Sequence, residues 1–253
     1  MTNRDEIIDF LNNYLEIDSI DDFSPKGLQV EGSQEVHLVT LGVSACLELF
    51  EKAVSLNSEM IIVHHGMFWD GEPKVIKGHL KKRLKILLEN DITLLAYHLP
   101  LDKHPEIGNN ALIAKNLGLN NIKPFGYYKN QNIGYSGILN KRLNSSELHK
   151  KIDELFNSKS IFFNYGPSEI KSIAIVSGGF DNNIFREFIN SKIDILISGE
   201  VREPLQELCK EEKINYIAAG HYNTEKFGVQ KIGELLTNKF NLKTQFIEIP
   251  NPL

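Results

Sequence analysis

Short apolar runs alternate along this chain with longer segments whose leucines follow helical spacing. The run Ile61-Ile62-Val63 is typical of a buried strand, whereas 77–89 places its leucines on one face of a helix. Strands that alternate with helices of this length predict parallel pairing with right-handed crossovers. The pattern therefore predicts an α/β fold.

The same order of elements occurs twice. The first half is expected to contain strands and helices, in alternation, at 38–43, 47–56, 61–63, 77–89, 92–97 and 109–117. The second half is expected to repeat them at 172–176, 182–191, 194–197, 204–212, 215–219 and 224–238. Additional strands at 133–139 and 160–164 flank a helix at 146–156, and Thr2 or Asn3 is expected to cap a first helix. We predict two similar αβα lobes, residues 1–125 and 126–253, with a metal site in the cleft between them.

Histidines and carboxylates follow three of these strands. His64 and His65 end one strand, and the pairs His98/Asp102 and His221/Glu225, each four residues apart, follow two others. Parallel α/β sheets place their sites at such strand ends, and imidazole and carboxylate donors suit zinc, iron or manganese. The conjunction predicts a site for divalent metal.

Adjacent side chains on a regular strand point to opposite faces, so His64 and His65 reach one site only where the backbone bends. Gly66 permits such a bend. The bend would direct the two imidazoles to two neighbouring ions, which Asp102 or Glu225 could bridge. Two such ions activate a water and polarise a substrate oxygen.

Each feature also has a structural interpretation. An isolated His-His pair is more often a turn or a satisfied interior pair, and Glu225 also suits the start of a helix. Glu200 fits a proton-transferring base and equally a residue that caps the next helix. The aromatic pair Phe68-Trp69 fits core packing, and alternatively stacking on a planar heterocycle.

Composition narrows the class of protein. The chain has 253 residues, 42% of them hydrophobic, and a net charge of −5, which argues against a nucleic-acid-binding surface. The two cysteines, Cys46 and Cys209, form no CxxC pattern, so neither a disulfide framework nor a zinc-thiolate site is expected. The N-terminus lacks a signal-peptide core and no apolar run approaches a membrane span, so we expect a cytoplasmic protein with no membrane association.

Several motifs resemble those of the GTP cyclohydrolase 1 type 2 family, the NIF-three-like proteins, over nearly the whole chain. They are Gly27-Leu28-Gln29-Val30-Glu31-Gly32, Val63-His64-His65-Gly66 with Phe68-Trp69, Tyr97-His98-Leu99-Pro100-Leu101-Asp102, Gly108-Asn109-Asn110, Ser198-Gly199-Glu200, and Gly220-His221-Tyr222-Asn223-Thr224-Glu225. The short connection at 123–172 indicates that the additional domain of longer members is not inserted here.

The resemblance implies a dinuclear metal centre with two divalent ions per chain. Its ligands match His64 and Asp102 on one ion and His65 and His221 on the other, with Glu225 as the bridge. His98 is not among the usual ligands and would act beside the centre as a proton carrier. Glu200 is the second candidate for proton transfer.

The family name implies hydrolytic opening of the GTP purine ring with release of formate. Hydrolysis of another small molecule, such as a phosphate ester, and a non-catalytic metal-binding or partner-binding assembly remain the alternatives, because fold and metal site do not determine substrate. The resemblance also implies a homohexamer, a toroidal trimer of dimers.

Overall fold

The computed structural model describes residues 2–73 and 75–252. The chain divides into two compact units. Unit 1 comprises Met1–Leu101 and Gly228–Pro250, and unit 2 comprises Asp102–Phe227 and Asn251–Leu253. The chain therefore enters unit 2 within the short helix α4 (Leu99–Lys103) and leaves it near the start of α10 (Lys226–Phe240).

These units group the chain differently from the expected division at residue 125. Strand β7 (Asn120–Tyr128) pairs antiparallel with β8 (Gln131–Asn144) of unit 2, which draws the segment before residue 125 into that unit. Strand β13 (Lys243–Phe246) pairs parallel with β4 (Leu38–Ser44), which returns the end of the chain to unit 1. Strand pairing, rather than the order of the repeat, thus sets the membership of each unit.

Unit 1 is built on a five-stranded sheet in the order β13-β4-β5-β6-β2. Its parallel strands β5 (Met60–His65) and β6 (Thr93–Ala96) lie beside β4, and β2 (Gly27–Val30) closes the edge in the antiparallel direction. A separate antiparallel pair joins β1 (Thr2–Asn3) to β3 (Glu35–Val36).

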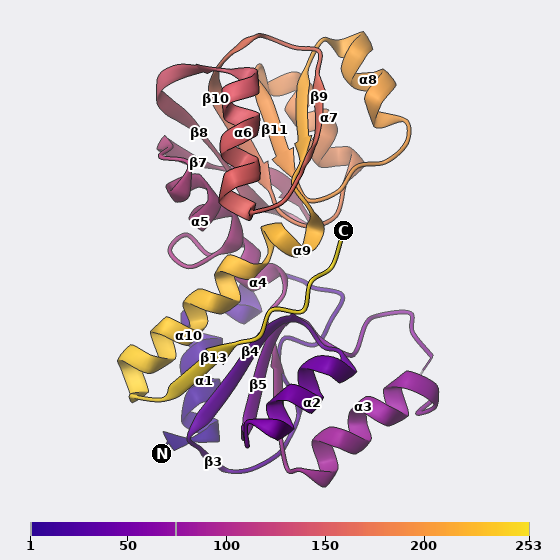
Figure 1. The fold of residues 1–253 in the computed structure, drawn as a ribbon, viewed down its shortest axis with the longest axis vertical. Helices are drawn as coiled ribbons and strands as arrows, with labels where there is room; N and C mark the ends of the chain where they lie inside the picture. Colours follow the sequence, from indigo (N-terminus) through magenta and orange to yellow (C-terminus); the bar gives the residue numbers. More distant parts are fainter. Residues whose placement is uncertain (1, 74, 253) are drawn as a thin grey trace. The chain divides into compact units, whose positions relative to one another are not determined.

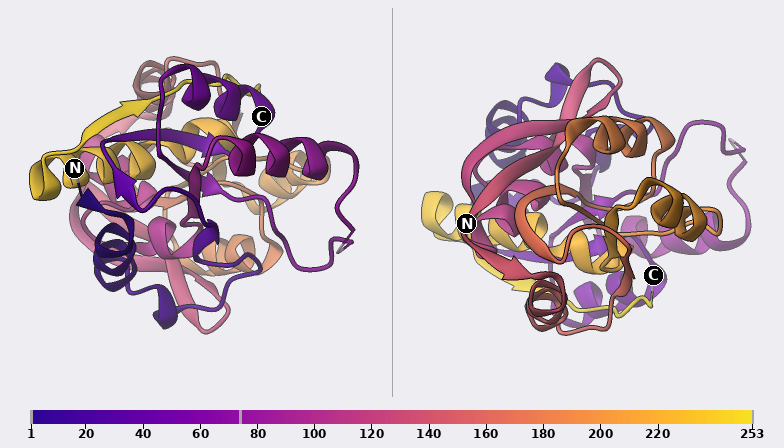
Figure 2. Two further views of the ribbon diagram at one scale, coloured as in Figure 1. Left: turned by 90° about the horizontal axis from the view of Figure 1, so that it is seen from below. Right: turned by 90° about the horizontal axis from the view of Figure 1, so that it is seen from above.

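Helices cover both faces of this sheet (Figures 1 and 2). Helices α2 (Leu47–Ser55) and α3 (Gly78–Glu89) pack on one face, and α1 (Arg4–Tyr14) and α10 on the other, while η1 (Ile17–Ser19) is a 3-10 turn. Two adjacent residues of β4 show the alternation. A Cβ added to Gly42 would lie 2.6 Å from Leu49 of α2, whereas Leu41 packs against Gly233 of α10.

Unit 2 is built on a six-stranded sheet in the order β7-β8-β10-β11-β12-β9. The strands β10 (Glu169–Val176), β11 (Ile195–Ser198) and β12 (Asn215–Ala218) are parallel to one another, and β9 (Ile161–Asn164) and β8 flank them in the antiparallel direction. The three parallel strands repeat the arrangement of β4, β5 and β6 in unit 1.

Alternate strand residues of unit 2 face two helical layers. Residues such as Ile175, Ile197 and Ile217 form a core cluster with α5 (Asn109–Asn116) and α6 (Ser145–Phe156). On the opposite face, Phe185 of α7 (Asn182–Ser191) lies against Tyr216, with ring centroids 6.1 Å apart. The remaining helices are α8 (Leu205–Glu212) and α9 (His221–Thr224).

The expected α/β class with two similar αβα lobes is confirmed, because each unit places a sheet between helical layers. The N-terminal cap is also confirmed, since the Asn3 side chain accepts a hydrogen bond from the backbone N–H of Asp5. The expected single helix at 224–238 is wrong at its start, where α9 ends and Glu225 interrupts it with φ −116° and ψ 6°. None of the helices in the described part of the chain is long and apolar enough to cross a membrane.

We expect the Asp194→Ala substitution to destabilise unit 2. One carboxylate oxygen of Asp194 accepts hydrogen bonds from the backbone N–H groups of Lys171 and Ser172, at 2.8 Å each, and from the Ser172 hydroxyl at 2.9 Å. Each hydrogen bond to a charged group is worth about 2 kcal/mol, so the loss of three should lower the free energy of unfolding by at least about that amount. Urea denaturation checks this, with Glu211→Ala on the exposed surface of α8 as the control. Equal midpoints for the two variants would contradict the anchoring role.

Candidate metal centre

The end of β5 carries His64 and His65 into the same region of unit 1. The His64 side chain is fully buried, and the two imidazole rings have centroids 4.7 Å apart and planes inclined by 51°. Both residues still belong to β5, which ends at His65. The two adjacent side chains are therefore brought together at the carboxyl end of the strand.

Hydrogen bonds fix one nitrogen of each of these rings. Nδ1 of His64 lies 2.9 Å from the carbonyl oxygen of Tyr97, which can only accept, so this nitrogen carries the proton. Nδ1 of His65 lies 3.1 Å from the hydroxyl of Ser44 on the neighbouring strand. A metal-ligating histidine is commonly held in this way, with one nitrogen bonded to the protein and the other presented to the ion.

His98 completes a histidine trio with His64 and His65. One nitrogen from each of the three rings lies within 4.8 Å of the others, which is close enough for a shared metal ion. The His98 ring centroid is 5.0 Å from that of His64 and 5.5 Å from that of His65. The aromatic rings of Phe23 and Trp69 meet His98 edge to face.

Asp22 orients His98. Its Oδ1 lies 2.9 Å from Nδ1 of His98, and its Oδ2 accepts the backbone N–H of Leu99 at 3.0 Å. Burial raises the pKa of Asp22, but the hydrogen bonds from His98, Leu99 and Phe23 outweigh burial and lower the pKa below its usual value. Asp22 is therefore an ionised partner that fixes the orientation of the His98 ring.

Gly66 is required by the packing beside the histidines. A Cβ at this position would lie 2.2 Å from the side-chain amide of Gln29, which accepts the backbone N–H of Met67 at 2.7 Å. Gln29 belongs to β2 and thus secures the turn that follows His65. This contact gives Gln29 of the Gly27–Gly32 motif a role that the sequence did not indicate.

In unit 2, Asp102 lies on α4 and is only 4% exposed. Its Oδ1 accepts hydrogen bonds from Nδ2 of Asn109 at 2.9 Å and from the Ser177 hydroxyl at 3.0 Å. Asn110 connects the same elements, because its Oδ1 accepts the backbone N–H of Ser177 and its amide donates to the carbonyl of Ile133. Asn109 and Ser177 therefore hold the Asp102 carboxylate, and Asn110 holds the backbone around it.

His221 of α9 lies between two carboxylates. Its Nδ1 is 2.6 Å from Oε1 of Glu200, and its Nε2 is 3.1 Å from Oε2 of Glu225. Glu225 is 2% exposed, whereas the Glu200 side chain is 39% exposed. Glu200 is thus placed to orient the His221 ring from outside, and Glu225 occupies the buried position.

The charge around His221 follows from this geometry. Burial lowers the pKa of His221, but the contacts with Glu225 and Glu200 outweigh burial and raise the pKa from 6.5 to about 9. The protonated ring donates to both carboxylates. A metal ion ligated by Nε2 would replace that proton, because only neutral imidazole binds metal.

Gly178, in the turn after β10, is also required by packing. Gly178 has φ +73°, and a Cβ there would lie 2.2 Å from Oε1 of Glu225. Its backbone N–H donates to the Thr224 hydroxyl at 3.0 Å. The turn after β10 therefore approaches the Glu225 carboxylate so closely that only glycine fits.

The expected site residues thus fall into two groups. His64, His65 and His98 lie together in unit 1, and His221, Glu225 and Glu200 lie together in unit 2, where Asp102 is held by its own network. Sequence reasoning did not foresee the contacts of four side chains that fix these groups: Asp22, Gln29, Ser44 and Ser177. The donor set of imidazoles and buried carboxylates fits divalent metal.

Comparisons with known proteins place the chain in a family. The Duf34/NIF3 (NGG1p interacting factor 3) family description matches residues 2–252. A relative from Pyrococcus abyssi named "GTP cyclohydrolase 1 type 2 homolog" is 40% identical over 251 residues and covers 99% of each chain.

Solved structures agree with this assignment. That of protein ybgI, described as of unknown function, is 36% identical, with a TM-score of 0.94 and full coverage of both chains. That of TTHA1606 from Thermus thermophilus is 32% identical, with a TM-score of 0.86 and full coverage of both chains. The chain therefore belongs to the Duf34/NIF3 family.

Proposed function

We propose that this protein is a dinuclear-metal-dependent hydrolase of a small molecule, with GTP as the leading candidate substrate. The observation that carries the proposal is the way the proposed ligands are held. Nδ1 of His64, His65 and His221 and Oδ1 of Asp102 each contact a protein group. Such outer contacts orient metal ligands and fix their tautomers. The relatives' name, GTP cyclohydrolase 1 type 2 homolog, supports the choice of substrate.

We assign two divalent ions to five ligands. His64 and Asp102 would hold one ion, His65 and His221 the other, and Glu225 would bridge them. The buried position of Glu225 supports the bridging role, because a carboxylate that is 2% exposed requires positive charge beside it. His221 supplies that charge in the metal-free protein.

When bound, the ions supply an activated water and polarise a substrate oxygen, which is the chemistry that opening a purine ring with release of formate requires. The protein's own residues bind and move protons. Asp22 holds Nδ1 of His98, so that His98 offers Nε2 to accept or deliver a proton. Glu200 holds Nδ1 of His221 and is exposed enough to exchange protons with solvent.

The first prediction concerns turnover. We expect the metal-loaded full chain to release formate from GTP, and the His98→Ala variant to do so about 100-fold more slowly with unchanged metal content, because a positioned acid or base contributes that factor. Formate and phosphate are measured in parallel, and His79→Ala on the exposed surface of α3 is the control.

The products distinguish the competing functions. Phosphate without formate would replace the proposed reaction with hydrolysis of a phosphate ester. Neither product from protein that retains two ions would indicate a non-catalytic metal-binding assembly.

A second prediction separates the two glutamates. We expect the wild-type protein to retain two equivalents of metal after loading and desalting, and Glu225→Gln to retain one or fewer, because the bridge loses charge toward both ions. Glu200→Gln should keep both sites and lose about tenfold in affinity, since it acts through His221. Elemental analysis and metal titration measure this, with the exposed Glu203→Gln as the control. Equal metal affinities for the variants at 200 and 225 would reject the assigned roles.

A third prediction concerns assembly. We propose a closed homohexamer, a trimer of dimers. The edge strands β7 and β9 of the unit 2 sheet support it, because they carry Tyr127 at 56% exposure and Ile161 at 50%, and exposed edges with apolar side chains favour association. Light scattering coupled to size exclusion should show about six chains of 28.7 kDa per particle. A single monomeric species over a hundredfold range of concentration would contradict this assembly.

A further inference from the structure

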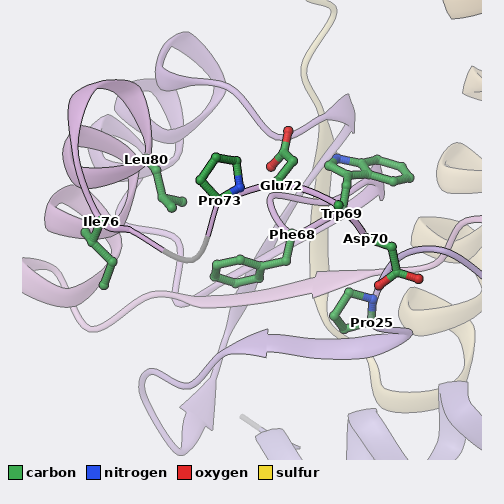
Figure 3. A pocket seen from close by; sticks show the side chains of 9 residues that line it. Pro25, Phe68, Trp69, Asp70, Glu72, Pro73, Ile76 and Leu80 are labelled. Atoms are coloured by element: carbon green, nitrogen blue, oxygen red, sulfur yellow. The ribbon is translucent and has the colours of Figure 1, made fainter.

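A pocket of about 450 Å³ opens in unit 1 beside Trp69. Figure 3 shows Phe68, Pro73, Ile76 and Leu80 gathered along it, with Trp69, Asp70 and Pro25 at the other end. Its volume lies in the range of small-molecule sites, and its wall is mostly apolar with a few polar groups, which is the usual composition of such sites. The pocket therefore has the size and lining of a ligand site.

Trp69 connects this pocket to the histidines. The indole lines the pocket, and its centroid lies 5.2 Å from the His98 ring and 5.9 Å from the His65 ring. Trp69 therefore contacts both the pocket and the histidines to which we assign metal binding and proton transfer. Core packing accounts for Phe68, which packs against the unit 1 core, but it does not account for the open space beside Trp69.

The charge of the lining restricts the ligand. Asp70 and Glu72 contribute two carboxylates to it. Ionised carboxylates only accept hydrogen bonds, so they favour N–H donors and repel phosphate. The aromatic and proline surfaces favour a flat ring.

We propose that this pocket binds a planar heterocycle with N–H donors, such as the purine base of a nucleoside, and leaves any attached phosphates outside. The ring would stack on Trp69 and donate hydrogen bonds to Asp70 or Glu72. The proposal deepens the proposed function and rests on it, since it names which part of the substrate Trp69 holds.

Trp69 is the only tryptophan in the sequence, so its fluorescence reports on the pocket directly. Guanosine is titrated into the metal-loaded full chain, and inorganic triphosphate is titrated separately as the probe for phosphate binding. We expect saturable quenching by guanosine and none by triphosphate at the same concentrations. Quenching by triphosphate alone would overturn the assignment of the ring to this pocket.

The charge contribution is tested with an isosteric double variant. Asp70→Asn/Glu72→Gln should bind guanosine about tenfold more weakly, since charge-assisted hydrogen bonds are replaced by neutral ones. Both carboxylates belong to exposed residues, so folding is expected to be retained, as circular dichroism would show. The matched control is Leu88→Ala, an exposed residue of the same helix as Leu80 that does not line the pocket. An unchanged affinity in the double variant would overturn the recognition of N–H donors.

The pocket and the proposed reaction can fail separately. Formate release without saturable quenching would overturn the pocket and leave the hydrolase intact. Quenching without formate release would support the pocket and reject the reaction. A second copy of the chain is the competing occupant of the pocket, and the Ile76→Asp variant tests it. If this variant forms smaller particles and still binds guanosine with unchanged affinity, the pocket is a contact between copies and the proposal is overturned.

Discussion

The site depends on one constraint: an imidazole or carboxylate that is removed from water must have its polar atoms satisfied by the protein. Such side chains lie near the carboxyl ends of parallel strands. Residues of the neighbouring strands and turns supply their hydrogen-bond partners. The Tyr97 carbonyl, at the end of β6, accepts from His64, at the end of β5. In unit 2, the Ser177 hydroxyl after β10 donates to Asp102. In each contact, one polar atom of the side chain is bonded to the protein. This bond fixes the direction in which the second polar atom of the same side chain points.

The same constraint places glycine where partners approach closely. Gly66 and Gly178 follow strands of different units, and at each a Cβ would lie 2.2 Å from a side-chain polar atom, that of Gln29 or of Glu225. In one case the amide secures the turn after the histidines, and in the other the turn encloses the buried carboxylate. The polar side chains that lie against these two positions thus require glycine there. The requirement occurs once in each unit.

Apolar periodicity was sufficient to predict the repeated strands and helices, and it located α7 at its observed ends. It did not indicate β7 or β13, because both are edge strands with few buried residues and therefore carry little apolar alternation. In the site, histidines and carboxylates after apolar strands were visible in the sequence. Asp22 was not, because it lies 76 residues from His98 and precedes no regular element that would mark it. Such partners are set by tertiary contact and leave no local pattern.

The two histidine–carboxylate pairs, one in each unit, differ in what their second nitrogen meets. Asp22 fixes His98 and Glu200 fixes His221, each through Nδ1. Nε2 of His221 already contacts the buried Glu225 carboxylate, so its proton must leave before that nitrogen can ligate a metal. His98 faces two other histidines, and the ionised Asp22 carboxylate holds its Nδ1. An Nδ1 contact of this kind orients metal ligands and proton carriers alike, so the two histidines differ on the other side of the ring, where His221 meets a buried carboxylate and His98 lies beside two imidazole rings.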